Sequence, residues 1–129
     1  MPRDPLAILA RLRRIDTDAA RLRLAGAQAH LAAQQDAVAA IERELRAEHP
    51  EDAPRTYGDF LARMLAARHQ QAAALARAGA ALDAERDALV AARTQEKVLD
   101  ALRDRRAAAE RRDGLRREQA RLEDAIPRG

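Results

Sequence analysis

Few residues of this chain belong to types that do chemistry, and those few are widely spaced. The aliphatic hydroxyl groups belong to Thr17, Thr56 and Thr94, because the chain has neither serine nor cysteine. None of them has a histidine nearby in the sequence that could activate it as a nucleophile. The sequence therefore predicts no catalytic residue.

The histidines and glycines are equally scattered. His30, His49 and His69 contain no pair spaced four residues apart, the spacing that places two metal ligands on one face of a helix. The glycines are too far apart for a phosphate-binding loop. We expect no metal, no cofactor and no small-molecule substrate, and we predict that the protein is not an enzyme.

The composition is typical of long helices. Aromatic residues make up 2% of the 129 residues and charged residues 35%, and a chain dominated by Ala, Glu, Leu and Arg favours a coiled coil. So few large side chains can fill a narrow interface between two helices, where alanine permits close approach. No apolar stretch approaches the roughly 20 residues that span a bilayer. We expect one domain over residues 1–129, located in the cytoplasm.

One short break, residues 49–58, divides two helical stretches. Pro50 and Pro54 should stop a helix because proline lacks a backbone N–H and clashes with the preceding turn. Thr56 or Asp59 could then cap a new helix. The prediction is an all-α fold: an antiparallel two-helix coiled-coil hairpin with helices at 5–48 and 59–126, the C-terminal one longer. A dimer of straight rods is the competing architecture.

Apolar residues at spacings of three, four and seven mark the faces expected to meet. In the first helix they are Leu6, Leu9, Leu12, Ile15, Ala19 and Leu22, then Leu24, Leu31, Val38 and Leu45 in a different phase. In the second they are Leu61, Arg68, Leu75, Leu82, Leu89 and Glu96, followed by a shift of phase to Val98 and Leu102. The expected pairs are Leu31 with Leu75, Leu24 with Leu82, and Ile8 with Val98.

The end of the second helix should project beyond the first. Residues 103–126 are rich in arginine interleaved with acid and hold few large apolar residues, and a single helix of this kind is marginal alone. We expect a partner protein to cover it, with Arg111, Arg112, Arg116, Arg117 and Arg121 as contacts. The alternative is a solvated helix held by pairs such as Asp113 with Arg117. Nucleic acid is disfavoured, because no aromatic residue is present there to stack on a base.

Both aromatic residues lie beside the break. Phe60 and Met64 are four apart and share one face of a helix. If Leu61 and Leu65 occupy the interface, Phe60 and Met64 form a small exposed apolar patch, with Tyr57 at its edge, and such patches mark binding sites. The alternative is that these residues close the end of the coiled coil against Ile41 and Leu45.

Three stretches, in this order, resemble the FliJ family, the small stalk proteins of the bacterial flagellar export apparatus. They are residues 6–45, with Ile15-Asp-Thr-Asp-Ala-Ala-Arg-Leu22 near the start; residues 57–64, Tyr-Gly-Asp-Phe-Leu-Ala-Arg-Met; and residues 97–124, from Lys97-Val-Leu-Asp-Ala-Leu102 to Glu123-Asp124. The resemblance implies a non-catalytic, cytoplasmic coiled-coil hairpin, peripheral on the inner membrane.

The resemblance also implies partners. These are the hexameric flagellar export ATPase and its regulator, the membrane export gate protein and export chaperones. The projecting arginines would contact the ATPase ring, and Tyr57, Phe60 and Met64 would bind the gate. Three other readings stay open: the stalk of a non-flagellar type III secretion system, a generic coiled-coil scaffold, and a nucleic-acid-associated helical protein.

Overall fold

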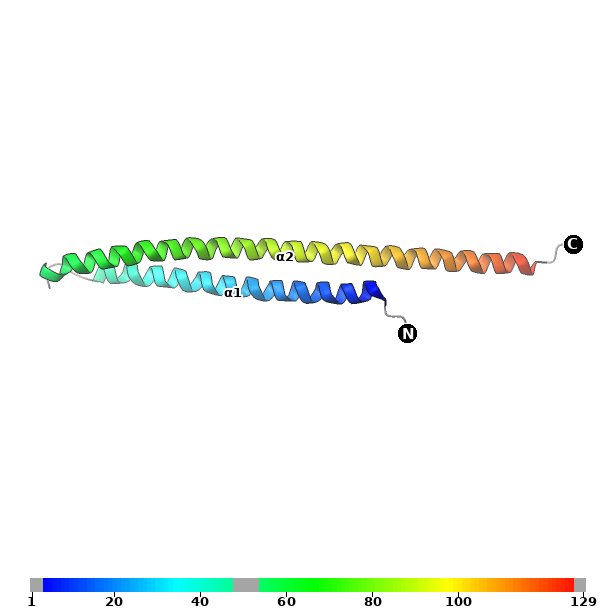
Figure 1. Cartoon of the computed structure of the whole chain (residues 1–129), viewed down its shortest axis with the longest axis horizontal. Helices are drawn as coiled ribbons and strands as arrows, with labels where there is room; N and C mark the ends of the chain where they lie inside the picture. Colours follow the sequence, from blue (N-terminus) through cyan, green and yellow to red (C-terminus); the bar gives the residue numbers. More distant parts are fainter. Residues whose placement is uncertain (1–3, 48–53, 127–129) are drawn as a thin grey trace. The chain divides into compact units, whose positions relative to one another are not determined.

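The computed structural model describes residues 4–47 and 54–126 and consists of two helices (Figure 1). Helix α1 spans Pro5–Ala47 and helix α2 spans Pro54–Ala125. The two helices contact each other in antiparallel pairing, and the described residues contain no strand. This confirms the all-α two-helix hairpin with a longer C-terminal helix, and it excludes one continuous rod.

Helix α1 begins at Pro5, as expected, and Asp4 caps it. The backbone N–H of Leu6 donates to Asp4 Oδ1 at 3.0 Å, and the N–H of Ile8 donates to the Asp4 carbonyl at 3.2 Å. Asp4 thus accepts hydrogen bonds from donors that have no partner within the first turn. Pro5 is compatible with the first helical position because its missing N–H is not needed there.

The start of α2 corrects the sequence prediction. The helix begins at Pro54, not near residue 59, so Thr56, Gly58 and Asp59 lie inside it and neither Thr56 nor Asp59 is its cap. Proline ends a helix that reaches it but suits the first turn of a helix that starts with it. The rest of the predicted break, including His49 and Pro50, lies outside the described residues.

The contacts group the chain into two compact units, Met1–Thr17 with Ala91–Gly129, and Asp18–Val90. In the second unit, Arg23 Nε contacts Glu85 Oε2 at 3.2 Å and Arg68 Nε contacts Glu42 Oε1 at 2.7 Å. The amide of Gln71 donates to the amide oxygen of Gln34 between these levels.

These contacts agree with the expected register in the second unit. Leu31 and Leu75 lie one helical turn from Gln34 and Gln71, respectively, and both are half-buried. Leu24 and Leu82 are the second expected pair. Leu24 follows Arg23 and is half-buried, and Leu82 lies one helical turn before Glu85 and is buried. The single domain over residues 1–129 stays a prediction.

In α1 the buried and half-buried residues keep one heptad phase from end to end. They include Leu6, Ala10, Arg13, Thr17, Ala20, Leu24, Ala27, Leu31, Gln34, Val38, Ile41 and Leu45, in alternating steps of four and three. The predicted change of phase between Leu22 and Leu24 is therefore wrong. Leu9, Leu12, Ile15 and Leu22 are 42–76% exposed. The phase of Leu24, Leu31 and Leu45 continues back to Thr17 and Ala10, because α1 contains no stutter.

Helix α2 differs from the prediction in two places. Arg68 is exposed, and the half-buried residues around it are Met64, Ala67 and Gln71. Two successive steps of four, from Ala74 to Ala78 to Leu82, then shift the phase, as a stutter does in a coiled coil.

The second difference lies past Glu96, where no shift of phase occurs. Leu99 is buried at 7%, whereas Val98 and Leu102 are 56% and 46% exposed. Ile8 is also 45% exposed, so the expected pairing of Ile8 with Val98 is wrong. Leu99 follows Leu82 and Leu89 at helical spacing, so α2 keeps one phase from Leu82 to Leu99.

Gly26 offers a direct test of helix stability. It lies inside α1 and is exposed, its φ is not positive, and an added Cβ would meet nothing within 4 Å. Because glycine inside a helix costs about 0.5–1 kcal/mol relative to alanine, we expect Gly26→Ala to raise the free energy of unfolding by about that amount. Urea unfolding followed by circular dichroism measures it. The reverse change nearby, Ala29→Gly, should destabilise similarly, and a Gly26→Ala variant that is no more stable than the parent would contradict the prediction.

Candidate functional site

The threonine and histidine residues considered above form no catalytic or metal site in the described part of the chain. Thr17 is 1% exposed and its hydroxyl already has acceptors. His30 and His69 are exposed, and His49 lies outside the described residues. Over residues 4–47 and 54–126, no group of three His, Asp or Glu side chains is placed to hold a metal ion. Four features of the described residues concern binding or stability instead: a partly buried polar pair, an ion-pair junction, a charged helix end and an aromatic pair.

The polar pair joins α1 to α2 inside the first unit. Thr17 Oγ1 lies 2.9 Å from Glu96 Oε2 and 3.0 Å from the carbonyl oxygen of Arg13. A threonine hydroxyl has one proton, so these two acceptors share one donor. The pair stands where a coiled coil normally places two apolar side chains, and it fixes which residues of α1 and α2 lie opposite each other.

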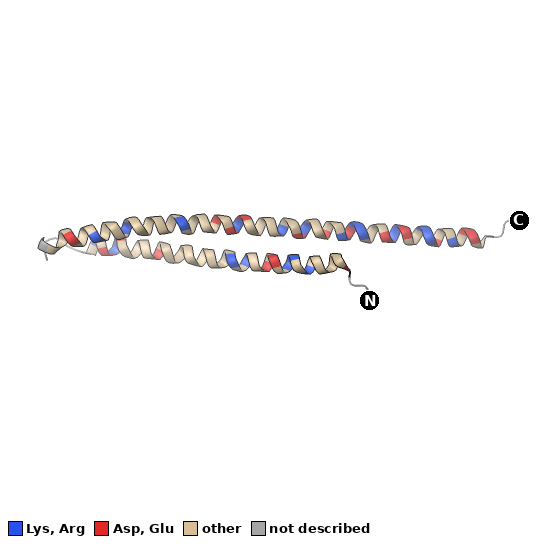
Figure 2. Cartoon of the chain, in the orientation of Figure 1, with Lys and Arg blue, Asp and Glu red and all other residues tan. Residues whose placement is uncertain are grey.

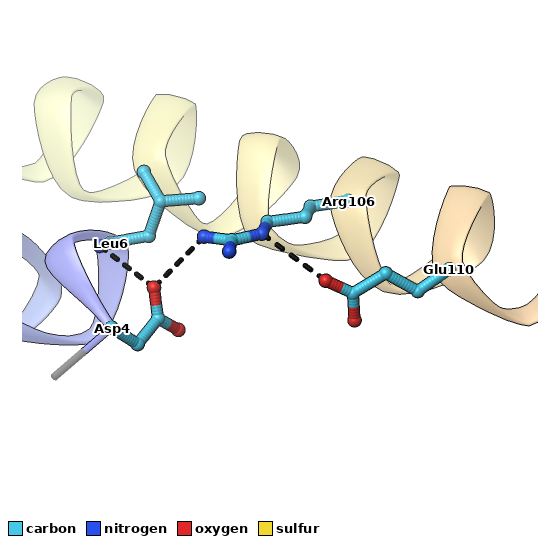
Figure 3. A network of polar contacts seen from close by, with 4 residues as sticks. All are labelled: Asp4, Leu6, Arg106 and Glu110. Atoms are coloured by element: carbon cyan, nitrogen blue, oxygen red, sulfur yellow. Dashed lines mark hydrogen bonds and ion pairs between the residues drawn. The ribbon is translucent and has the colours of Figure 1, made fainter. Parts of the chain in front are cut away.

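The junction joins the start of α1 to α2. Arg106 Nη1 contacts Asp4 Oδ1 at 2.9 Å, and Arg106 Nε contacts Glu110 Oε1 at 3.3 Å (Figure 3). The same Asp4 oxygen accepts the N–H of Leu6, so one carboxylate both caps α1 and binds α2. The guanidinium is about half exposed, and such a pair contributes at most about 1 kcal/mol. Its main effect is to set the level at which α1 begins.

The charged helix end is residues 111–126, which follow that junction. The projection was expected from residue 103, but Arg103 is half-buried and Arg106 binds Asp4, so it begins after Glu110. Every described residue from 111 to 126 except Gly114 is exposed. Acidic and basic residues alternate along this part of α2 (Figure 2), yet Arg111, Arg112, Arg116, Arg117 and Arg121 form no ion pair with a described residue, the suggested Asp113–Arg117 pair included.

A line of apolar residues runs along the same end. Leu115, Leu122 and Ile126 are spaced by seven and four, so they lie near one face of the helix. They are 66%, 65% and 64% exposed. This helix end therefore presents an apolar line among arginines that have no partner in the described part of the chain.

The aromatic pair lies at the start of α2. The rings of Tyr57 and Phe60 are 6.3 Å apart, centre to centre, and tilted by 34°. Tyr57, Phe60, Leu61 and Met64 are all half-buried, whereas Leu65 is 47% exposed. The expectation that Leu61 and Leu65 together take the interface and leave Phe60 and Met64 outside it is therefore wrong. The contact face of α2 passes through Phe60 and Met64, leaving part of each side chain exposed.

The match to a protein family decides the identity. The family model described as the flagellar FliJ protein matches residues 2–125 of the chain. The chain belongs to the FliJ family. This confirms the resemblance noted from the sequence and identifies this FliJ-family chain as a component of the flagellar protein export apparatus. No curated protein and no solved structure matches it.

Neither helix of this FliJ-family chain holds, in the residues described, a stretch both long and apolar enough to cross a membrane.

Sequence reasoning missed Thr17 and Glu96 as partners, and it missed the exposure of Leu9, Val98 and Leu102. One signal was available for α1. Counting back in sevens from Leu45 through Leu24 leads to Thr17. The prediction instead placed the larger residues Leu9, Leu12 and Ile15 on the face of the first helix that meets the second. No comparable signal identifies Arg106 as the partner of Asp4, because that choice depends on the register of the two helices.

The Thr17–Glu96 pair generates a stability prediction. Thr17→Val keeps the shape of the side chain and removes its hydroxyl group. The half-buried Glu96 carboxylate then loses this hydrogen-bond donor. We expect a loss of about 1–2 kcal/mol in urea unfolding. The double variant Thr17→Val/Glu96→Leu, which replaces both partners by apolar groups, should recover most of that loss. A single variant as stable as the parent, or a double variant no better than the single, would show that the pair contributes nothing.

Proposed function

We propose that this chain is a non-catalytic stalk of the flagellar export apparatus, which links the export ATPase ring to the membrane export gate. The observation that carries the proposal is the family match over residues 2–125. The exposed, arginine-rich end of the longer helix α2 supports it, because such a helix end can contact a surrounding ring. The stalk would act in the cytoplasm, peripheral to the inner membrane.

Residues 111–126 are the part proposed to contact the ATPase ring. The supporting observation is that this helix end combines exposed arginines with the apolar line of Leu115, Leu122 and Ile126. A helix that buries no side chains of its own gains most from a partner that surrounds it. An enclosing ring with acidic side chains would pair with arginines on several sides at once.

The start of α2 is the part proposed to bind the export gate. Tyr57, Phe60 and Met64 are half-buried, so they can contact a partner with the exposed part of each side chain. Aromatic residues and methionine are enriched at protein interfaces. The proposed site therefore shares its residues with the helix–helix interface instead of lying wholly outside it.

The remaining partners follow the same family assignment. We propose that the chain also contacts the regulator of the export ATPase and export chaperones. The match is to a flagellar family, which favours the flagellar apparatus over the stalk of a non-flagellar secretion system and over a generic scaffold.

The ring contact predicts a charge-dependent interaction. Changing Arg111, Arg112, Arg116, Arg117 and Arg121 to glutamine should weaken binding to the purified export ATPase by at least about tenfold, since several exposed ion pairs of about 0.2–1 kcal/mol are lost together. Truncation after Glu110 should do the same while keeping the Asp4–Arg106 junction.

The matched control removes equal charge from other exposed arginines: Arg14, Arg43, Arg63, Arg77 and Arg93. This control should bind the ATPase like the parent. Equal weakening in both five-residue variants would mean that net charge alone matters, and unchanged binding after truncation would exclude residues 111–129 as the contact.

The gate contact predicts a separation of binding from stability. Phe60→Ala/Met64→Ala should abolish detectable binding to the cytoplasmic part of the export gate protein and also lower the melting temperature, because both side chains are half-buried. Leu61→Ala, in the same turn and equally half-buried, should lower the melting temperature but keep gate binding. If the double variant binds normally, these residues serve packing alone and the proposed gate site is wrong.

A further inference from the structure

An apolar groove lies in the first unit, where the interface between the helices is small and polar. Leu9 of α1 and Val98 and Leu102 of α2 line it, with the buried Leu99 beside them, and its volume is about 370 Å³. The three outer side chains are 42%, 56% and 46% exposed. The groove exists because Ala10 and Thr17, rather than these larger residues, occupy the interface.

Further exposed apolar residues extend this surface along α1. Ile8, Leu12 and Ile15 are 45%, 50% and 56% exposed, and Leu12 lies one helical turn from Leu9. Val98 and Leu102 are likewise one turn apart on α2. Exposed apolar patches of this extent mark interaction sites, and side chains at helical spacing on two neighbouring helices form the groove into which a third helix packs.

The charged residues around the groove indicate the charge of the partner that it binds. Its polar lining consists of Arg13, Thr94 and Gln95, so its charged lining residue is a cation. The nearby acids Asp4, Asp100, Asp104 and Glu110 line a different hollow, of about 680 Å³. Arg11, one turn from Ile15, adds a second exposed cation beside the extended apolar surface.

Arg13 is available to a partner. Its Nη1 lies 3.5 Å from Asp16 Oδ2, and the two side chains are 41% and 58% exposed. A loose, exposed pair of this kind contributes little to stability. A carboxylate brought in next to the apolar groove can therefore replace Asp16 as the partner of Arg13.

We propose that this groove binds an amphipathic helix of a partner protein, whose apolar face covers Leu9, Val98 and Leu102 and whose flanking carboxylate pairs with Arg13. The site differs from the surfaces proposed for the ATPase ring and the export gate, which are residues 111–126 and 57–64. It does not depend on the proposed stalk function.

The test uses the full chain and a synthetic helical peptide with leucines at heptad spacing, glutamates flanking them and alanines elsewhere. Fluorescence anisotropy of the labelled peptide should show saturable binding in the micromolar range. Val98→Gln/Leu102→Gln should weaken binding at least about tenfold, and Arg13→Gln several-fold. The matched control Leu22→Gln/Val90→Gln, at exposed apolar residues outside the groove, should leave binding unchanged.

Four results would overturn the proposal. The peptide could fail to bind, or could bind the groove variant as well as the parent. A peptide with lysines in place of the glutamates could bind equally well, which would exclude the acidic partner. Sedimentation equilibrium could show that the chain is a dimer that Val98→Gln/Leu102→Gln separates, which would make a second copy the occupant.

Discussion

The structure depends on the continuity of α1. A helix of 43 residues without a proline or a turn inside it keeps one rotational phase. Leu24, Leu31, Val38 and Leu45 all turn toward α2 and determine that phase for the whole element. Burying Leu9, Leu12 and Ile15 instead would need a change of phase inside α1, such as the stutter in α2, and the buried residues of α1 show no such change.

This constraint shapes the first unit. Its interface is built from Ala10, Thr17 and Leu99 with the polar partner Glu96, so it contains smaller and more polar side chains than the interface around Leu82 and Leu89. The surplus of large apolar residues lies on the outside, where it forms the groove. The single phase of α1 thus explains both the small, polar interface of the first unit and the exposed apolar surface beside it.

The C-terminal end of α2 extends past the last contact with α1. Arg106 binds Asp4 at the last level where α1 is present, and residues 111–126 beyond it bury almost nothing. We propose this segment as the surface that contacts the ATPase ring. The charged helix end, the aromatic pair and the apolar groove are the three surfaces that we propose for partners.

The sequence by itself determined the two helices, the antiparallel hairpin and the family. These follow from local rules: the prolines at the break, the cap at Asp4 and the helix-forming composition act within a few residues. It also identified the arginine-rich end and the cluster of Tyr57, Phe60 and Met64. Only the tertiary structure decided which stripe of α1 is buried, because two stripes at helical spacing compete there. That choice depends on the register with α2, which pairs Thr17 with Glu96 and Asp4 with Arg106 across the chain.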